Sequence, residues 1–198
     1  MNTKVVILNG PPNCGKDTLA DAMYHDYTGA NVARRAMKDG LYDLTADLFL
    51  VDREWFRIVC ADRDRKESPM KRLGGKSPRE ALIYVSEKVV KPAFGLDYFG
   101  RYAAENLEQG ALNIFSDGGF VEEAIPILNV VGLDNVLLVQ IYREGCSFDG
   151  DSRNYLPRDM FVHSAVLPNE KLSTATCELA HITSKFLGLS NELSPLWH

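Results

Sequence analysis

A glycine-rich stretch near the start of the chain carries the residue types that bind phosphate. Residues 10–18 read GPPNCGKDT, follow an apolar run at 4–9 and precede a stretch of helical pattern. Glycines let the backbone curl so that successive N–H groups, with the helix dipole behind them, point at one anion. Lys16 would then reach the β- and γ-phosphates of a nucleoside triphosphate. Pattern, context and position favour a phosphate-binding loop over a plain turn, with these candidate nucleotide ligands: Gly10, Asn13, Cys14, Gly15, Lys16, Asp17 and Thr18.

The position after Lys16 bears on metal binding. Loops of this kind usually place Ser or Thr there to hold Mg²⁺, whereas this chain has Asp17 followed by Thr18. Asp17 could bind the metal directly or through water, or it could stabilise the N-terminus of the following helix. The sequence leaves these alternatives open. Thr18 would bind the α-phosphate or support the water shell of the metal.

A second acidic residue, Asp117, follows the apolar run at 111–115. A carboxylate at the carboxyl end of a buried strand is where a phosphate-loop protein orders its Mg²⁺. Asp117 is therefore a third candidate metal ligand, beside Asp17 and Thr18. The alternative is an Asp in a glycine-rich turn.

Arginines follow a later strand. Arg143 closes an apolar run at 135–142, and Arg153 and Arg158 lie in the stretch at 144–159, which has no clear period. Such a segment is typical of a mobile lid, here expected at about 143–160, that brings guanidinium groups over transferring phosphates. An ordinary surface loop with exposed arginines is the alternative.

The middle of the chain is basic although the whole chain is acidic. Residues 53–91 hold 11 basic and 6 acidic side chains, in a chain whose net charge is −5. This balance suggests a local site for a small phosphorylated ligand, unless it is only a solvated helical face. Ser77, Pro78 and Arg79 would begin a helix whose first turn favours a phosphate, with Arg79 binding it through two parallel N–H···O bonds. Arg79 pairing with Glu80 on the surface is the alternative.

Strand and helix patterns alternate along the chain and predict an α/β fold. A mostly parallel sheet with helices on both sides accounts for this order in one domain spanning 1–198. A helical acceptor-binding region is expected at about 38–109. The expected strands are 4–9, 111–116, 135–142 and 162–167, and the expected helices are 17–27, 36–50, 52–61, 78–90, 98–108, 121–131 and 172–187.

Composition excludes several classes of protein. With 25% charged and 45% hydrophobic residues over 198 positions, the chain is typical of a globular protein, and it has no apolar run long enough to span a membrane. The net acidic charge makes it a poor binder of nucleic acid. The first residues are too short an apolar run for a signal peptide, and four cysteines without CxxC spacing indicate a reducing cytoplasm.

The loop form GPPxxGKxT resembles that of nucleoside monophosphate kinases, and GKDT followed by Ala20 and Asp21 is similar to the phage-type deoxynucleoside monophosphate kinases. Short matches at 35–38, 77–79 and 143–155 fall in the order that this family shows. The resemblance implies a three-layer P-loop NTPase fold, ATP as phosphoryl donor with Mg²⁺, a deoxynucleoside monophosphate as acceptor, and the cytoplasm of a phage host as location. It leaves a homodimer open. Lys16, Asp117, Arg143 and Arg153 would carry the transfer, and the acceptor would be bound by Lys38, Arg72, Arg79 and Arg101.

One position departs from the family. The resemblance predicts an Arg two residues after Asp117, but position 119 is Gly. This departure and Asp17 also suit a non-catalytic nucleotide-binding protein. A phosphate-loop kinase for a non-nucleotide metabolite, such as a phosphomevalonate-like substrate, is the other alternative. A GTP-dependent switch is disfavoured because no NKxD motif occurs.

The sequence also makes a prediction about cysteine reactivity. Lys16 and the helix N-terminus should lower the pKa of Cys14, which should then alkylate faster than Cys60 or Cys177.

Overall fold

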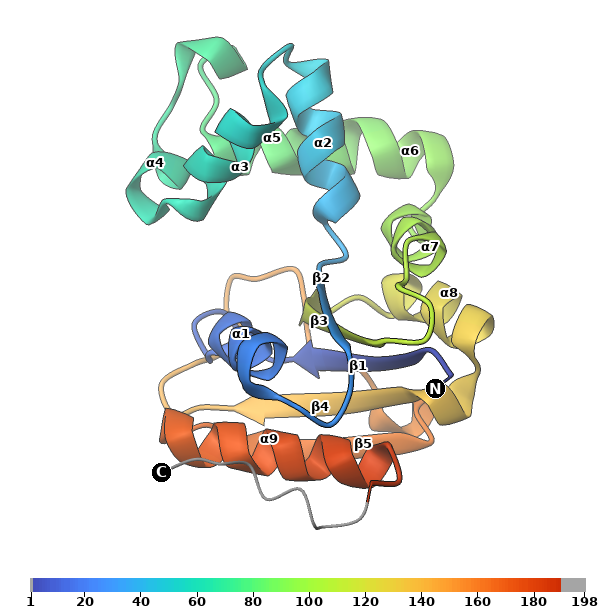
Figure 1. Ribbon diagram of the computed structural model, residues 1–198. Helices are drawn as coiled ribbons and strands as arrows, with labels where there is room; N and C mark the ends of the chain where they lie inside the picture. The colour runs from blue at the N-terminus through green and yellow to red at the C-terminus, as the bar shows by residue number, and fades with distance from the viewer. Residues whose placement is uncertain (1, 190–198) are drawn as a thin grey trace.

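Five parallel strands form the central sheet of the computed structural model, which describes residues 2–189 (Figure 1). The strand order is β2-β3-β1-β4-β5, so the first strand lies in the middle. Val5 of this strand is paired with Asn113 on one side and Val136 on the other. The strands are β1 (Lys4–Asn9), β2 (Val32–Arg35), β3 (Leu112–Gly118), β4 (Val136–Tyr142) and β5 (His163–Pro168).

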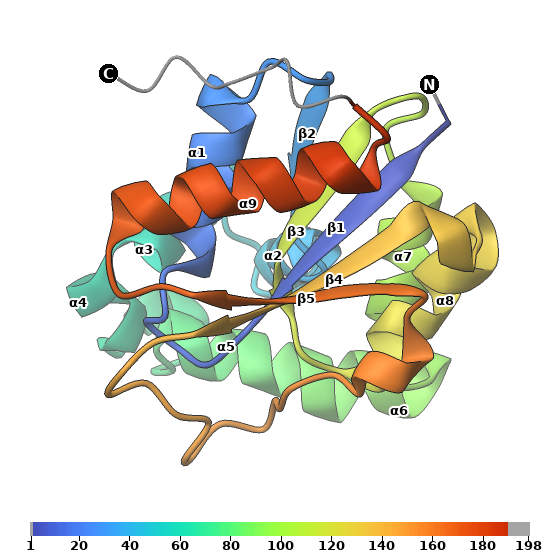
Figure 2. The same ribbon diagram turned by 90° about the horizontal axis from the view of Figure 1, so that it is seen from below.

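Helices cover both faces of this sheet, which explains why its central strands are continuous apolar runs. One face packs on α1 (Lys16–Asp26) and α9 (Leu172–Phe186), and the other on α7 (Tyr98–Glu105) and α8 (Val121–Val131). Figure 2 shows α9 and α1 on one side of the strands and α7 and α8 on the other. The predicted α/β fold is therefore confirmed.

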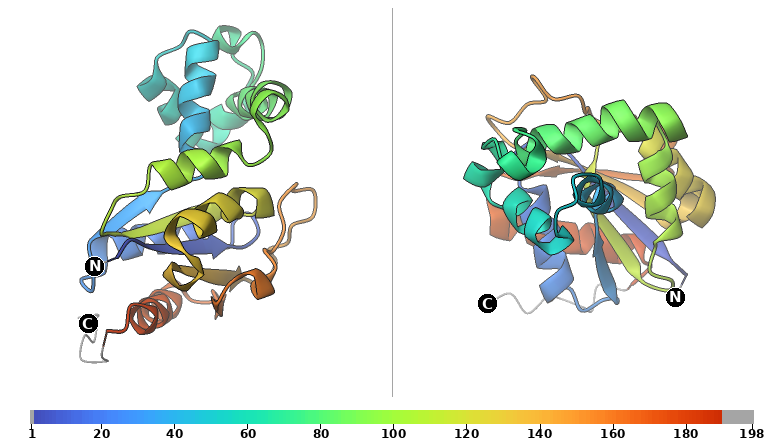
Figure 3. Two further views of the ribbon diagram at one scale, coloured as in Figure 1. Left: turned by 90° about the vertical axis from the view of Figure 1, so that its right-hand side faces the viewer. Right: turned by 90° about the horizontal axis from the view of Figure 1, so that it is seen from above.

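A helical region with its own core stands over the carboxyl ends of the strands, between β2 and β3 in the chain (Figure 3). Phe56 and Leu73 are fully buried inside it. Its helices are α2 (Asp39–Leu48), α3 (Arg53–Ala61), α4 (Arg63–Glu67), α5 (Pro78–Tyr84), a π-helical stretch (Val85–Val90) and α6 (Lys91–Phe94). Short 3₁₀ turns lie at Lys71–Leu73, Leu133–Asn135 and Arg158–Met160.

Two expectations differ from the structure near the start of the helical region. The strand β2 was not expected, because an edge strand of four residues ending in two arginines lacks an apolar run. The helix expected at 36–50 begins only at Asp39, since the backbone before it turns to donate hydrogen bonds to Asp117. The other expected elements are present with ends shifted by a few residues, and α5 begins with the capping box of Ser77 and Glu80. Within residues 2–189 no helix is long and apolar enough to cross a membrane.

Candidate active site

The loop between β1 and α1 has a backbone that only certain residues allow. Gly15 has a φ of 95°, and a Cβ at this position would collide with the side-chain amide of Asn169. A Cβ on Gly10 would fall 2.7 Å from the carbonyl oxygen of Ile141. Asn169 also donates to the Cys14 carbonyl at 2.7 Å. Glycine is therefore required at both positions, because the loop packs against the end of β4 and against Asn169, which follows β5.

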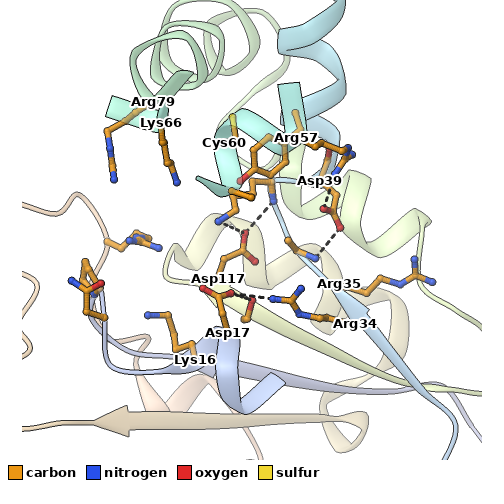
Figure 4. Close-up of a pocket in the computed structure, with 18 of the residues that line it drawn as sticks. Lys16, Asp17, Arg34, Arg35, Asp39, Arg57, Cys60, Lys66, Arg79 and Asp117 are labelled. Atoms are coloured by element: carbon orange, nitrogen blue, oxygen red, sulfur yellow. Dashed lines mark hydrogen bonds and ion pairs between the residues drawn. The ribbon is translucent and has the colours of Figure 1, made fainter. Parts of the chain in front are cut away.

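Lys16 lies at the centre of this loop and is largely buried (Figure 4). Its ammonium group donates to the carbonyl oxygens of Gly10 at 2.7 Å and Pro11 at 2.6 Å. Burial lowers the pKa of Lys16, and the nearby Arg153 guanidinium acts in the same direction. The lysine is thus folded over the loop, with its charge at the point where a bound phosphate would receive the loop's N–H groups.

Asp17 opens α1 and faces the ends of two other strands. Its Oδ1 accepts a hydrogen bond from the Ser116 hydroxyl at 2.7 Å and from Arg34 at 3.5 Å. A carboxylate beside a hydroxyl, next to a phosphate-binding loop, is the hard oxygen set that Mg²⁺ takes together with substrate phosphates. Asp17 and Ser116 therefore fit a magnesium ion. Thr18 is exposed on the same first turn of α1.

Asp117 makes different contacts. Both of its carboxylate oxygens accept backbone hydrogen bonds, from Met37 at 2.8 Å and from Lys38 at 3.3 Å, and the ammonium group of Lys38 lies 3.9 Å away. Burial opposes the charge of Lys38, but Asp117, with Tyr42 and Asp17, raises its pKa above the ordinary value. Asp117 therefore ties the end of β3 to the start of α2. These contacts favour Asp17 over Asp117 as the metal ligand.

Arg153 occupies the space that a side chain at position 119 would need. A Cβ on Gly119 would lie 2.8 Å from the Cβ and 2.9 Å from the Cγ of Arg153. Asp151 holds this arginine by its backbone N–H at 2.9 Å and by its Nε and Nη2 at 2.8 Å and 2.6 Å. These hydrogen bonds lower the pKa of Asp151 to about 2 and raise that of Arg153. The chain therefore has no side chain at 119, and the aliphatic part of an arginine from another loop lies in that space.

The segment that carries Arg153 is anchored to the sheet in its second half. Asn9, at the end of β1, donates to the carbonyl of Asn154 at 3.0 Å and accepts from the N–H of Leu156 at 2.8 Å. Gln140 donates to the Leu156 carbonyl at 2.9 Å, and Leu156 is buried. Residues 154–156 are therefore hydrogen-bonded to β1 and β4, and movement of the lid expected at about 143–160 stays a prediction.

A cleft of about 1460 Å³ separates the loop from the helical region and collects many of the predicted site residues. It is lined by the predicted residues Asn13, Lys16, Asp17, Lys38, Arg79, Asp117 and Arg153. Arg143 lies outside the lining and donates to the Asn13 carbonyl at 3.4 Å.

Two predicted acceptor ligands lie elsewhere. The Arg72 guanidinium packs over the Trp55 ring, 5.4 Å from its centroid, and is not part of the cleft lining. Arg101, on α7, pairs with Asp97 at 2.6 Å and also donates to the Phe94 carbonyl. Neither arginine reaches the cleft. The prediction failed because charge and order in the chain do not indicate which face of a helix points inward.

Several residues that line the cleft, and Asn169, which contacts the loop, were not identified from the sequence. Arg34 and Arg35 lie at the end of the unexpected strand β2, and Arg63 and Lys66 lie on α4, a stretch of mixed charges without an apolar pattern. Asn169 follows β5 and has no local motif that links it to a loop 155 positions earlier. Only folding brings these residues to the loop.

Cys14 is buried in the folded loop, which its neighbours in the sequence do not indicate. Its side chain is fully buried, and burial raises the pKa of the thiol although Lys16 acts to lower it. Cys177 is exposed. The expectation of a lowered Cys14 pKa was therefore wrong, because loss of hydration outweighs one nearby cation.

The sheet order, the glycine loop after β1 and the buried lysine define an α/β fold in which a glycine-rich loop joins the central strand to the first helix. Neither a known family model nor a curated protein matches the chain. Among solved structures it is similar to a gluconokinase from Sinorhizobium meliloti 1021, with 8% sequence identity, a TM-score of 0.45 and 92% of each chain covered. This likeness is too weak to extend the description of the site.

Proposed function

We propose that this protein transfers the γ-phosphoryl group of ATP to a nucleoside monophosphate, with a deoxynucleotide as the preferred acceptor. The observation that carries the proposal is the cleft, which runs from the phosphate-binding loop to the helical region and has cations at both ends. Lys16 lies at one end and Arg79 at the other (Figure 4). Such a cleft suits two phosphorylated ligands that meet end to end.

The donor would lie on the loop. Backbone N–H groups of residues 13–16 and the ammonium group of Lys16 would hold the β- and γ-phosphates. Asp17 and Ser116 would hold Mg²⁺, which neutralises phosphate charge when bound. Arg153, fixed by Asp151, would stabilise the charge of the transferring phosphoryl group without having to reorganise.

The state of Asp117 supports a phosphate acceptor over a hydroxyl acceptor. A hydroxyl nucleophile is helped by a general base, whereas the carboxylate at the end of β3 is engaged with two backbone N–H groups and the Lys38 ammonium group. A monophosphate needs no base, since its second pKa near ~6 leaves it largely dianionic at neutral pH. The GKDT loop form supports the deoxynucleotide preference.

Arg79 would bind the acceptor phosphate from the first turn of α5. Its Nε donates to Glu67 at 2.6 Å, which leaves both terminal nitrogens of the guanidinium for a phosphate. The guanidinium is about half exposed at the cleft wall. Glu67 therefore holds Arg79 in place without consuming its bidentate face.

The test is ADP release from ATP and Mg²⁺ in the presence of each nucleoside and deoxynucleoside monophosphate, one at a time. We expect turnover that depends on one or a few monophosphates, and none with the corresponding nucleosides. ADP release that no monophosphate stimulates would overturn the proposal. ATP binding without any turnover would instead favour the non-catalytic protein.

A further inference from the structure

The short helix α4 (Arg63–Glu67) lines the cleft close to the loop at 10–18. Arg63, its first residue, donates from its guanidinium to the side-chain oxygen of Asn13 at 3.2 Å. Asn13 is part of the loop and has a φ of 64°. This contact joins the helical region to the loop, so side chains on the same face of α4 lie within reach of phosphates bound there.

Lys66 lies one turn further along and lines the same cleft. Its side chain is partly buried, and its ammonium group makes no hydrogen bond or ion pair with any group in residues 2–189. Its ionisable neighbours include two cations, Lys38 just before α2 and Arg79 on α5, together with Cys60 on α3 and Glu67 on α4. Burial and the two cations lower the pKa of Lys66. Figure 4 shows Lys66 and Arg79 side by side, both pointing into the cleft.

The carboxylates beside these cations already have partners. Lys38 lies 3.9 Å from Asp117 and Glu67 is bound to Arg79 at 2.6 Å, whereas the ammonium group of Lys66 has no ion pair within residues 2–189. A dianionic phosphate beside Lys66 and Arg79 would supply Lys66 with the negative charge and the acceptor atoms it lacks. A neutral ligand or a hydroxyl acceptor would not.

We propose that Lys66 is a phosphate ligand of the acceptor, and that it makes the enzyme selective for a substrate that already carries a phosphate monoester. This inference rests on the proposed function. It adds a residue that the sequence did not indicate, and it places the acceptor phosphate between α4 and α5, on the side of the cleft where Arg63 reaches the loop.

The helix itself does not depend on the Lys66 side chain. Asp62 caps α4 by accepting the N–H groups of Asp64 and Arg65, each at 3.0 Å. Replacement of Lys66 should therefore leave the helix in place. Arg65 provides a matched control, because it has the same charge on the same helix, is exposed and does not line the cleft.

The first experiment compares the steady-state kinetics of Lys66→Ala and Arg65→Ala. For Lys66→Ala we expect the KM for the monophosphate to rise at least ~10-fold, as for loss of a hydrogen bond to a charged group, with the KM for ATP within about twofold of wild type. Lys66→Arg should recover part of the loss. Arg65→Ala should match wild type. An unchanged acceptor KM in Lys66→Ala would contradict the inference.

The second experiment does not require turnover. The protein is acetylated with a limiting amount of an N-hydroxysuccinimide ester, and labelling of each lysine is measured by mass spectrometry with inorganic phosphate, a nucleoside monophosphate or a nucleoside added. Lys66 should be protected several-fold by phosphate and by the monophosphate but not by the nucleoside. Lys88, which is exposed and outside the cleft, should be unaffected.

These two experiments separate the inference from the proposed function. If no monophosphate supports ADP release but phosphate still protects Lys66, the anion site stands and the proposed kinase activity falls. If monophosphates are phosphorylated but Lys66 is neither protected nor needed for a normal acceptor KM, the kinase activity stands and the role of Lys66 falls.

Discussion

Replacement of Asp151 by Asn should slow phosphoryl transfer while leaving ATP binding nearly unchanged. Asp151 accepts three hydrogen bonds from Arg153, one from its backbone and two from its guanidinium. The aliphatic part of Arg153 lies against Gly119, so the arginine is held from both sides. Asparagine keeps the shape of the side chain but loses the charge and one of its two acceptor oxygens. The Arg153 guanidinium would then leave its position for part of the time.

The magnitude follows from the carboxylate's own ionisation. The hydrogen bonds to Arg153 lower the pKa of Asp151 to about 2, from an ordinary value near ~3.9. At about 1.4 kcal/mol per pKa unit, that difference is worth about 2 to 3 kcal/mol of attraction between the two groups. If most of this energy holds Arg153 in place, kcat should fall by about 10- to 100-fold.

The assay is the steady-state rate of ADP formation at saturating ATP and acceptor, with ATP affinity measured separately by equilibrium binding. Asp149→Asn is the matched control, because Asp149 also lines the cleft but accepts its hydrogen bond from Ser147. We expect the control to keep kcat within about twofold. A normal kcat in Asp151→Asn would refute the view that Arg153 is a catalytic residue positioned by Asp151.

The same pair makes a stability prediction with a defined sign. The pKa of Asp151 is lower in the folded state than in the unfolded state, so its contribution is complete above about pH 4 and is lost as the pH falls towards 2. The free energy of unfolding of wild type should therefore exceed that of Asp151→Asn at pH 6 and converge with it near pH 2. Urea titrations of both proteins at pH 6 and at pH 2 would measure these free energies. A difference between the two proteins that is the same at both pH values would contradict the prediction.

Three other experiments test the loop. Lys16→Ala should reduce kcat at least ~10²-fold without unfolding the protein, and near-normal turnover would show that the loop is not the triphosphate site. Iodoacetamide should alkylate Cys177 well before the buried Cys14, and mass spectrometry that finds Cys14 labelled first in native protein would refute the assigned burial. Asn169→Ala should weaken ATP binding several-fold, because it removes the 2.7 Å hydrogen bond to the Cys14 carbonyl. Unchanged ATP affinity in a binding titration would mean that the loop holds its shape without Asn169.

Local sequence patterns correctly predicted the apolar strands and the glycine-rich loop on which the site is built. The apolar runs that became β1, β3 and β4 are buried on both sides, and a buried parallel strand needs an unbroken hydrophobic sequence. The loop from Gly10 to Thr18 was equally readable, because its glycine spacing lies within one short segment between an apolar run and a helical pattern. Lys16 and Asp17 belong to this same segment. Their placement could therefore be predicted.

Long-range placement could not be predicted in the same way. Arg72 and Arg101 had the right charge and lay in the right region, but each faces a partner outside the cleft. Lys66 and Arg63 belong to a run of mixed charges whose inward face is set only when α3, α4 and α5 pack together. A charged side chain on a helix surface gives no periodic signal of what lies opposite.

Gly119 and Arg153 show most clearly the difference between what local sequence predicts and what only folding decides. The sequence indicated that an expected arginine was missing at position 119 and that an arginine existed at 153, but nothing linked two residues 34 positions apart. In the folded protein, the absence of a side chain at 119 is what admits Arg153 to the cleft. Composition and spacing thus specify which chemical groups the chain carries and which short segments can bind phosphate. The packing of distant loops against the sheet selects which charges meet at that segment, because burial, steric exclusion and ion pairing act between residues that are neighbours only after folding.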